Sequence, residues 1–166
     1  MKFSYCPSCG TKAVDREIGD EGLMPYCTTC EKPLFPFSYT CIITIVVDEN
    51  GLFAFIQQYN IPKHMYIAVA GYTKPGEPLE ETVKREVFEE IGLEATDVRY
   101  VKSYPLEIRD QLMTGFVAHV RHGDFKLSPE VETAKWFTES EAAEVLPKAS
   151  IVEMLYLDYL ANRERL

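Results

Sequence analysis

The stretch that decides the fold reads Gly71-Tyr-Thr-Lys-Pro-Gly-Glu77-Pro-Leu-Glu-Glu-Thr-Val-Lys-Arg85-Glu86-Val-Phe-Glu89-Glu90-Ile-Gly92-Leu93. Pro75 and Gly76 are typical of a loop. Pro78 suits the first turn of a helix, although the usual Ser or Thr cap is missing. Gly92 is typical of the residue at which a helix stops. The pattern therefore predicts a helix over about residues 79–91, preceded by a glycine-containing loop.

One side of this predicted helix is apolar, and it consists of Val83, Val87 and Ile91. At about 100° per residue, Glu90 lies about 60° and Glu86 about 100° from the centre of that apolar arc. Arg85 and Glu89 lie on the far side, both at about 160°. The acids therefore do not all occupy a solvated face, because Glu86 and Glu90, one turn apart, flank the side that is expected to be buried.

Clustered, desolvated carboxylates repel each other, and they are neutralised by protonation unless a positive charge lies among them. A divalent cation close to Glu86 and Glu90 would supply that charge. Oxygen ligands suit Mg²⁺ or Mn²⁺, and Mg²⁺ favours phosphate as a further ligand. The segment therefore predicts chemistry on a phosphate ester or a diphosphate. A solvated acidic surface helix is the alternative that spacing alone leaves open.

Strand patterns lie on both sides of this segment. Cys41–Val47 is rich in β-branched residues, and a turn at 48–51 leads to a returning strand at 52–58. Further strands are expected within 98–120 and over 133–137. Together they predict a sheet that includes chain from before and after the glutamate-rich helix.

Two more helices are expected near the end of the sequence. Thr138 with Glu141, and Ser150 with Glu153, both fit a capping box. The second helix, over about residues 151–160, carries many large apolar side chains and should pack on the sheet. Because strands and helices are mixed, the class is α/β or α+β.

The first 36 residues are rich in cysteine, proline and glycine and lack apolar periodicity, so we expect domains at 1–36 and 37–166. Two CxxC pairs in this first segment have the spacing of a zinc site, namely Cys6, Cys9, Cys27 and Cys30. Four thiolates close a tetrahedral Zn²⁺ site, which would be structural. Disulfides and a redox CxxC are the alternatives. Secretion, which disulfides need, and the βαβ context of a redox motif are both missing from the pattern.

The remaining cysteine, Cys41, lies within an apolar strand pattern and is interpreted as a buried small residue. The three histidines are scattered, without ligand spacing to the cysteines, and are interpreted as ordinary surface or strand residues: His64, His119 and His122.

The net charge of −9 and the pI near 4.9 argue against broad nucleic-acid binding, which needs a basic surface. An acidic site that recruits metal ions is compatible with a phosphorylated substrate. No apolar run approaches the roughly 18 residues of a membrane span. The N-terminus carries no apolar stretch of signal-peptide length. We therefore expect a cytoplasmic protein that does not bind membranes.

At this point the sequence resembles a known family. The Nudix box is G-x5-E-x7-R-E-U-x-E-E-x-G-U, where U is bulky and aliphatic, and the matching residues are Gly71, Glu77, Arg85, Glu86, Val87, Glu89, Glu90, Gly92 and Leu93. The resemblance implies an α/β/α sandwich around a mixed sheet, in which the box forms a loop, a helix and a loop. It also implies that a metal-activated water splits a nucleoside diphosphate linked to another group.

The resemblance assigns roles to the acids of the box. Glu86 and Glu90 would be ligands of Mg²⁺ or Mn²⁺, and Glu89 would be a further ligand or the base that deprotonates water. Glu77 would add a metal contact through water. A stretch that begins at Glu130 is similar to the one that supplies a downstream acid, so Glu130 is a candidate ligand, with a solvated loop glutamate as the alternative.

Other residues would position or bind the substrate. By the same resemblance, Arg85 would orient the glutamates through charge-assisted hydrogen bonds, and Gly71 would let the loop backbone approach the substrate. Tyr104, Phe53 and Tyr72 are candidates for stacking on a base, although most aromatic side chains in such a chain belong to the core.

The layout of four cysteines, sheet, box and strand block looks like the zinc-ribbon branch that includes the NADH pyrophosphatases. Those enzymes carry SQPWPFPxS followed by LMxGF, and the residues kept here are Ser103, Pro105, Leu112, Met113, Gly115 and Phe116. The aromatic and later positions differ, with Leu106, Glu107, Ile108, Arg109 and Gln111 in their place. Candidate substrates are therefore NADH-like or NAD-like dinucleotides, ADP-ribose and FAD-like compounds, and the branch suggests a homodimer.

Two hypotheses follow from the sequence. The first is a metal-dependent nucleotide diphosphatase. The second is a module that senses a nucleotide while the zinc ribbon contacts a partner. The complete set of acids in the box favours the first, because a pure sensor need not keep every acid.

Overall fold

The structure is a computed structural model that describes residues 3–59 and 61–165, so the first two residues of the expected zinc ribbon lie outside the described part. The chain divides into two compact units, Met1–Tyr39 and Thr40–Leu166. None of the described helices is long and apolar enough to cross a membrane.

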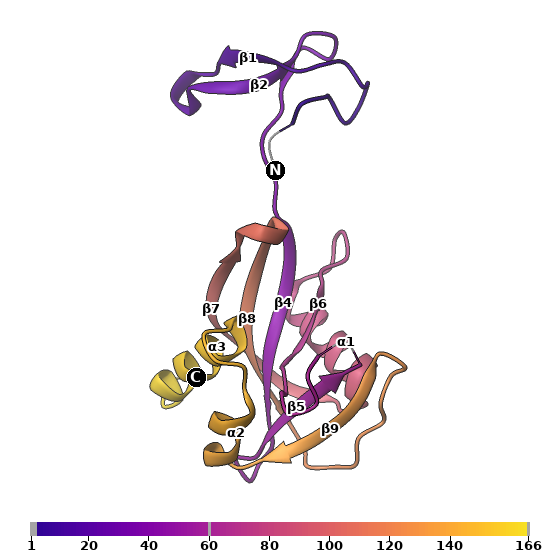
Figure 1. Ribbon diagram of the computed structural model, residues 1–166, viewed down its shortest axis with the longest axis vertical. Coiled ribbons are helices and arrows are strands. Elements are labelled where there is room, and N and C mark those ends of the chain that lie inside the picture. Colours follow the sequence, from indigo (N-terminus) through magenta and orange to yellow (C-terminus); the bar gives the residue numbers. More distant parts are fainter. Residues whose placement is uncertain (1–2, 60, 166) are drawn as a thin grey trace. The chain divides into compact units, whose positions relative to one another are not determined.

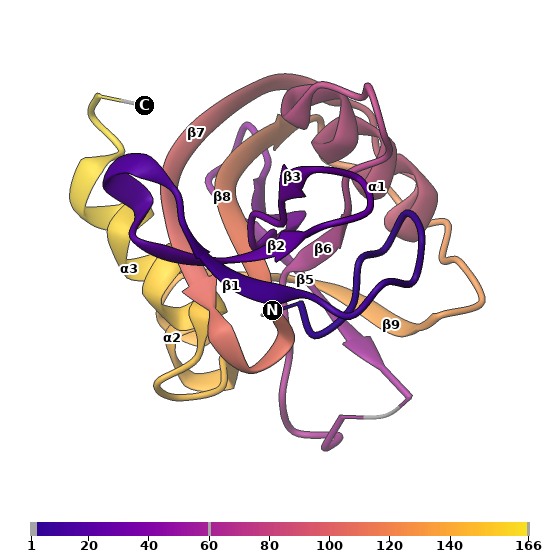
Figure 2. The same cartoon turned by 90° about the horizontal axis from the view of Figure 1, so that it is seen from above.

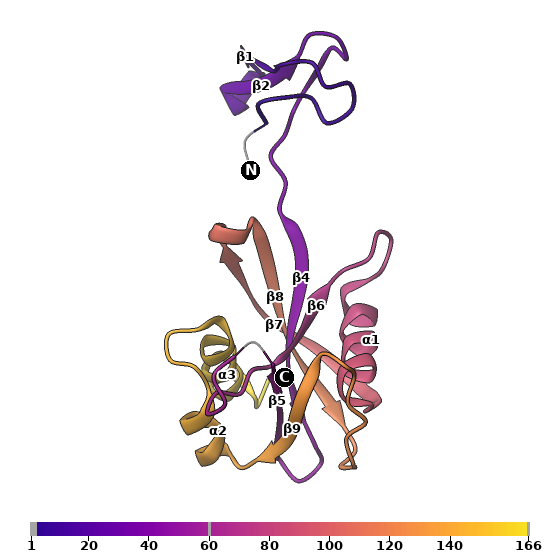
Figure 3. The same ribbon diagram turned by 45° about the vertical axis from the view of Figure 1, so that its right-hand side comes forward.

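The described residues of the second unit form a six-stranded sheet (Figure 1). Its strands are β4 (Tyr39–Val47), β5 (Phe53–Gln58), β6 (Val69–Tyr72), β7 (Ala95–Leu106), β8 (Gln111–Val120) and β9 (Val131–Phe137). The order is β7-β8-β4-β5-β9, and β6 also pairs with β4. The sheet is mixed, because β8 runs in the direction of β4 in Figures 1 and 3 whereas β5 and β6 are antiparallel to β4.

Helices cover both faces of this sheet (Figures 2 and 3). On one face lies α1 (Leu79–Ile91), and on the other lie α2 (Glu139–Val145) and α3 (Ile151–Asn162). A short 3-10 helix, η2 (Glu107–Arg109), connects β7 to β8. The expected α/β/α sandwich with a mixed sheet is confirmed.

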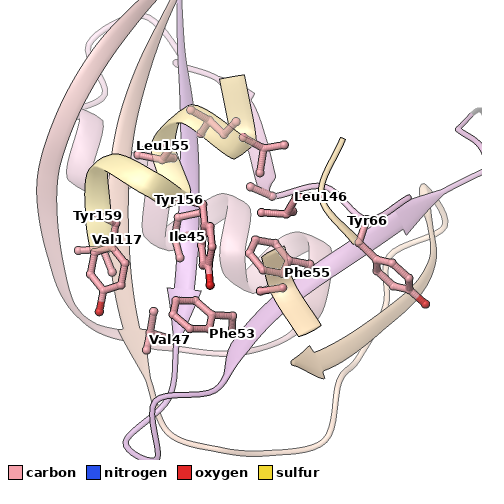
Figure 4. Packing of buried hydrophobic residues seen from close by; sticks show 14 of the residues in the cluster. Ile45, Val47, Phe53, Phe55, Tyr66, Val117, Leu146, Leu155, Tyr156 and Tyr159 are labelled. Atoms are coloured by element: carbon pink, nitrogen blue, oxygen red, sulfur yellow. The ribbon is translucent and has the colours of Figure 1, made fainter. Parts of the chain in front are cut away.

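Alternate residues of β4 explain why two helical layers can pack against one sheet. Ile42 and Val46 contribute to the core under α1, which includes Val83, Val87 and Ile91. Ile43 and Ile45 point to the opposite face, where Figure 4 shows Ile45 beside Phe53, Phe55, Leu155 and Tyr156. A strand buried on both faces reads as a continuous apolar run, as Cys41–Val47 does.

The first unit is a small three-stranded antiparallel sheet, with strands β1 (Val14–Glu17), β2 (Leu23–Cys27) and β3 (Lys32–Pro33) in that order. A 3-10 helix, η1 (Gly19–Glu21), lies between β1 and β2. Its fully buried apolar residues are few among those described: Cys6, Cys27 and Leu34. Two of these three are cysteines, so the apolar core of the unit is small without them.

The bounds of α1 agree with the prediction, because local signals set both ends. Gly92 adopts the left-handed conformation with φ 73° and donates its N–H to Phe88 O. The capping box at Thr138 forms as expected. The one at Ser150 forms only in half: Ser150 accepts from Glu153 N at 3.2 Å, but the Glu153 carboxylate accepts from Ala149 N instead.

Candidate active site

The loop before α1 is held by one carboxylate. Glu77 Oε2 accepts hydrogen bonds from Lys74 N at 3.1 Å and from Thr82 Oγ1 at 2.9 Å. The side chain therefore ties the loop to the first turn of α1, where Pro78 provides no side-chain cap. Glu77 thus fixes the loop against the helix through a side chain of the first turn.

Arg85 links this loop to the carboxylates of α1. Its Nε and Nη2 donate to the two oxygens of Glu77 at 2.7 and 2.9 Å, a two-point contact. Its Nη1 donates to Glu86 Oε1 at 2.5 Å and to Glu89 Oε2 at 3.0 Å, and Nη2 also donates to Tyr72 O at 3.1 Å. The Arg85 guanidinium, with help from the Lys74 amide, lowers the pKa of Glu77 to about 2.

Glu90 and Glu86 are the acids that the fold desolvates. Glu90 is 7% exposed, and its Oε2 atom is buried with no hydrogen-bond partner among the described residues. Burial raises the pKa of Glu90 to about 8, and repulsion from the carboxylates of Glu86 and Glu130 adds to this. Burial also raises the pKa of Glu86, although Arg85 opposes the shift. Glu89, by contrast, has a half-exposed side chain, as the helical angles predicted.

Gly71 on β6 touches the Glu86 carboxyl group. A Cβ atom at this position would lie 2.1 Å from Glu86 Cδ, which is far inside van der Waals contact. Gly71 is paired with Ile42 in the antiparallel register of β4 and β6. The residue is therefore glycine because strand and helix approach each other closely here, which allows the Glu86 carboxylate to reach the strand backbone.

On the expectation that Glu86 binds a metal ion, a Gly71→Ala substitution should displace its carboxylate and lower kcat/KM by about 10- to 100-fold, the cost of disturbing the contacts that support a metal ligand. Gly123→Ala is the matched control, because its Cβ would make only ordinary contacts, with Leu93 Cδ2 at 3.6 Å and Arg121 O at 4.0 Å. The measurement is steady-state kinetics with circular dichroism to verify folding. Equal activity of both variants would contradict the role given to Gly71.

A loop after β8 brings Glu130 to the other acids. Lys126 N donates to Ile91 O at 3.0 Å and Ser128 N donates to Glu90 O at 3.1 Å, so the loop docks on the C-terminal end of α1. A recess of about 300 Å³ results, and it is lined by Glu86, Glu89, Glu90, Ser128, Pro129 and Glu130. The four glutamates share this recess, but within the described part of the chain only the cysteines bring four ligand atoms within 4.8 Å of one another.

A larger cavity of about 670 Å³ adjoins the carboxylates. Its lining includes residues of β6 and its flanking segments, of α1, of η2 and of β8: Ala68, Ala70, Gly71, Tyr72, Lys74, Arg85, Glu86, Arg109, Gln111 and Met113. Of the three aromatic residues considered for base stacking, Phe53 and Tyr104 are buried in the core, whereas Tyr72 is 57% exposed and lines the cavity. Gln111 Nε2 donates to Tyr72 Oη at 2.5 Å.

Sequence reasoning assigned no role to Lys74 and noted Arg109 and Gln111 only as departures from a pattern. Gln111 and Tyr72 are 39 positions apart and meet because β8 and β6 both flank β4. The proximity of Lys74 to Glu89, at 4.0 Å between Nζ and Oε1, depends on how the loop folds back over α1. The spacing of the glycine and the acids located the segment, but no local signal located these three side chains.

The four cysteines of the first unit converge on one point. Cys9 Sγ lies 3.4 Å from Cys27 Sγ, and Cys6 Sγ lies 3.9 Å from Cys30 Sγ. These distances exceed a disulfide bond, and all five cysteines are free. Hydrogen bonds from Thr11 lower the pKa of Cys9 to about 6, which favours the thiolate that binds metals. Cys41 is 2% exposed in the core of the other unit, as expected.

One histidine is more than an ordinary surface residue. His122 Nδ1 lies 2.6 Å from Asp48 Oδ2, and its ring stacks on Trp136 with centroids 4.8 Å apart. It therefore anchors the start of the loop that carries Glu130. His64 and His119 remain an exposed loop residue and a half-buried strand residue.

A comparison with known protein families matches the second compact unit of the chain. The NUDIX domain family matches residues 39–155. The NAD-capped RNA hydrolase NudC of Vibrio vulnificus is 33% identical over 162 residues, which covers 95% of this chain and 59% of that protein. Nudix hydrolase 19, chloroplastic, of Arabidopsis thaliana is 34% identical over 154 residues, covering 87% of this chain and 34% of that protein. The chain thus spans little more than half of the first relative and about a third of the second.

Among solved structures, a NUDIX hydrolase from Nitrosomonas europaea superimposes with a TM-score of 0.74. It is 20% identical, and the match covers 99% of this chain and 93% of that one. At this identity the likeness speaks for the fold alone.

Proposed function

Since the chain belongs to the Nudix hydrolase family, we propose that it hydrolyses the diphosphate bond of a nucleoside diphosphate derivative with the help of a divalent metal ion. One observation carries this proposal. Glu90 presents a buried carboxylate oxygen that has no hydrogen-bond partner in the described part of the chain, in a recess shared with three further glutamates and next to a large cavity. A buried, unpaired carboxylate is costly unless a cation balances it.

The residues at this place fit a divalent metal ion of the Mg²⁺ or Mn²⁺ type. Glu86, Glu90 and Glu130 offer oxygen ligands, and burial together with repulsion from the other two raises the pKa of Glu90. We propose that these three residues hold the ion and that Glu89 is either a fourth ligand or the base. When bound, such an ion neutralises phosphate charge and makes a water molecule more acidic.

The other residues hold the acids in place. Arg85 bridges Glu77, Glu86 and Glu89, so it fixes the direction of the carboxylates while Glu77 fixes the loop. Glu89 is the half-exposed acid of the recess, and it is hydrogen-bonded to Arg85 on one side and faces Lys74 on the other. It is therefore the acid that a water in the recess can reach, which suits a base. The missing side chain of Gly71 leaves room for the Glu86 carboxylate, and we propose that the loop backbone that follows approaches the diphosphate.

Substrate and partners are proposed from the relatives and the cavity. The relatives named NAD-capped RNA hydrolases favour NAD-like substrates, and they keep a capped RNA among the compounds to test despite the acidic charge. Tyr72 is the aromatic ring of the cavity that a base can reach. We further propose structural Zn²⁺ at the four cysteines and a homodimer, the latter measurable by light scattering.

The direct test is an assay of the purified chain with NADH, NAD⁺, ADP-ribose, FAD and an NAD-capped RNA. We expect turnover of at least one compound with Mg²⁺ or Mn²⁺, products that carry monophosphates, and loss of turnover with a chelator that is restored by Mg²⁺. Tight binding of a compound without any turnover would instead support the nucleotide-sensing alternative and would contradict the proposed function.

A further inference from the structure

We propose that Arg109 binds an additional phosphate group of the substrate, so that the cavity selects nucleoside diphosphate derivatives with a phosphorylated ribose over those without it. The inference rests on the proposed function, because it takes the diphosphate to lie beside Glu86. It concerns the opposite end of the same cavity, to which no role has been given above.

The cavity connects two chemically different ends. At one end, Glu86 and Gly71 belong to α1 and β6, and at the other end Arg109 belongs to η2, in the hairpin between β7 and β8. Strand β4 lies between β6 and β8 in the sheet, so the two ends are separated by two strand spacings, or about 10 Å. A nucleoside that extends from a diphosphate at Glu86 can span a gap of this size.

The surface between these ends suits the body of a nucleoside. Ala68, Ala70 and Met113 provide small or flexible apolar side chains, and Tyr72 adds a ring that Gln111 holds by its hydroxyl group. Apolar surface with a few placed polar groups is the usual lining of a small-molecule site. Nothing in this stretch offers a cation until Arg109, so an anionic group of the ligand is drawn to that end.

The guanidinium of Arg109 is available for a ligand. Its side chain forms no hydrogen bond or ion pair within residues 3–59 and 61–165, and the residue is exposed. The other two cations among the lining residues are already paired: Arg85 binds Glu77, Glu86 and Glu89, and Lys74 faces Glu89 at 4.0 Å. Asp110, which follows Arg109, adopts a left-handed conformation with φ 50° and closes the hairpin turn that carries the arginine.

The chemistry of arginine favours a phosphate over other groups. Its planar fork can donate two parallel hydrogen bonds to phosphate oxygens, which gives both affinity and orientation. In a protein of net charge −9, an unpaired arginine at the rim of a cavity is also a local attraction for anions. Arg109 would therefore bind the phosphate group on the ribose, which a ribose-phosphorylated dinucleotide carries and a plain dinucleotide lacks.

Calorimetric titration with matched ligands tests this inference. Ca²⁺ replaces Mg²⁺ so that the ligands stay intact, and the pairs are NADP⁺ with NAD⁺ and coenzyme A with dephospho-coenzyme A. For at least one pair, we expect the wild-type chain to bind the phosphorylated member about tenfold more tightly, the size of one charge-assisted contact. Arg109→Gln should bring that ratio close to one, and Arg109→Lys should leave an intermediate ratio.

Arg99→Gln is the matched control, because Arg99 is an exposed arginine on the adjacent β7 that pairs with Asp97 and does not line the cavity. It should keep the wild-type ratio. Equal affinities within both pairs, a ratio that persists in Arg109→Gln, or no binding of any of the four ligands would overturn the inference. A failure of the proposed function shows separately, as binding without turnover when Mg²⁺ replaces Ca²⁺.

Discussion

A Glu90→Gln variant should lose nearly all hydrolytic activity and yet be at least as stable as the wild-type chain when no metal is present. The two effects have one cause. The buried oxygen of Glu90 has no hydrogen-bond partner among the described residues and faces Glu86 and Glu130. Because burial raises its pKa to about 8, the metal-free chain must take up a proton at Glu90 to fold at neutral pH, which costs stability. A glutamine is neutral without taking up a proton and can donate a hydrogen bond to a neighbouring carboxylate, which relieves a cost of about 1–3 kcal/mol.

The activity should fall on the order of a thousandfold, as when one strong electrostatic contact to a transition state is removed. Thermal unfolding with and without Mg²⁺ measures the predicted effect on stability. Mg²⁺ should raise the Tm of the wild-type chain, since a ligand stabilises the state that it binds, and should raise that of Glu90→Gln much less.

Glu80→Gln is the matched control, because Glu80 is an exposed acid in the first turn of the same helix and lies outside the recess. It should keep the wild-type activity and the wild-type response to Mg²⁺. A Glu90→Gln chain with unchanged turnover would remove the metal site from this helix. A metal-free Glu90→Gln chain that unfolds well below the wild-type Tm would show that the carboxylate is not under strain.

Which glutamates of α1 are buried and which are exposed could be predicted from the sequence, because this depends only on the helical repeat. The angle of about 60° from the apolar arc predicted a flanking position for Glu90, and its side chain is 7% exposed. The same reasoning placed Arg85 on the far side, but its side chain is 18% exposed. Arg85 is less exposed than predicted because it pairs with Glu77. Glu77 lies outside the helix, so the helical angles cannot predict this contact.

Non-local contacts also explain what the sequence did not reveal elsewhere. β6 is short and contains a glycine, so it has no strand pattern of its own, and it forms because β4 offers a free edge along Cys41–Thr44. The strands of the first unit are equally short, and their order depends on where the cysteines converge. Tyr104 and Tyr72 look alike in the sequence, and only packing decides that the first is buried and the second faces the cavity.

A Cys27→Ser substitution should unfold the first unit and leave the second unit folded. Cys27 is fully buried, its Sγ accepts a hydrogen bond from Cys30 N at 3.3 Å, and it belongs to a core whose other fully buried members are Cys6 and Leu34. So small a core cannot offset the entropy of ordering the chain, and the proposed zinc ion would supply the difference. Structural Zn²⁺ contributes about 10–16 kcal/mol in comparably small domains.

Elemental analysis and limited proteolysis of the full chain measure this outcome. The wild-type protein should carry one zinc per chain and resist cleavage, whereas Cys27→Ser should lose the zinc and be cut within its first unit while the second unit survives. Cys41→Ser is the control, because Cys41 is a buried cysteine of the other unit and should leave the zinc content unchanged. A Cys27→Ser chain that keeps stoichiometric zinc and resists cleavage would mean that the metal does not hold this unit together. Since the second unit has two apolar cores of its own, its unfolding transition should respond little to zinc removal.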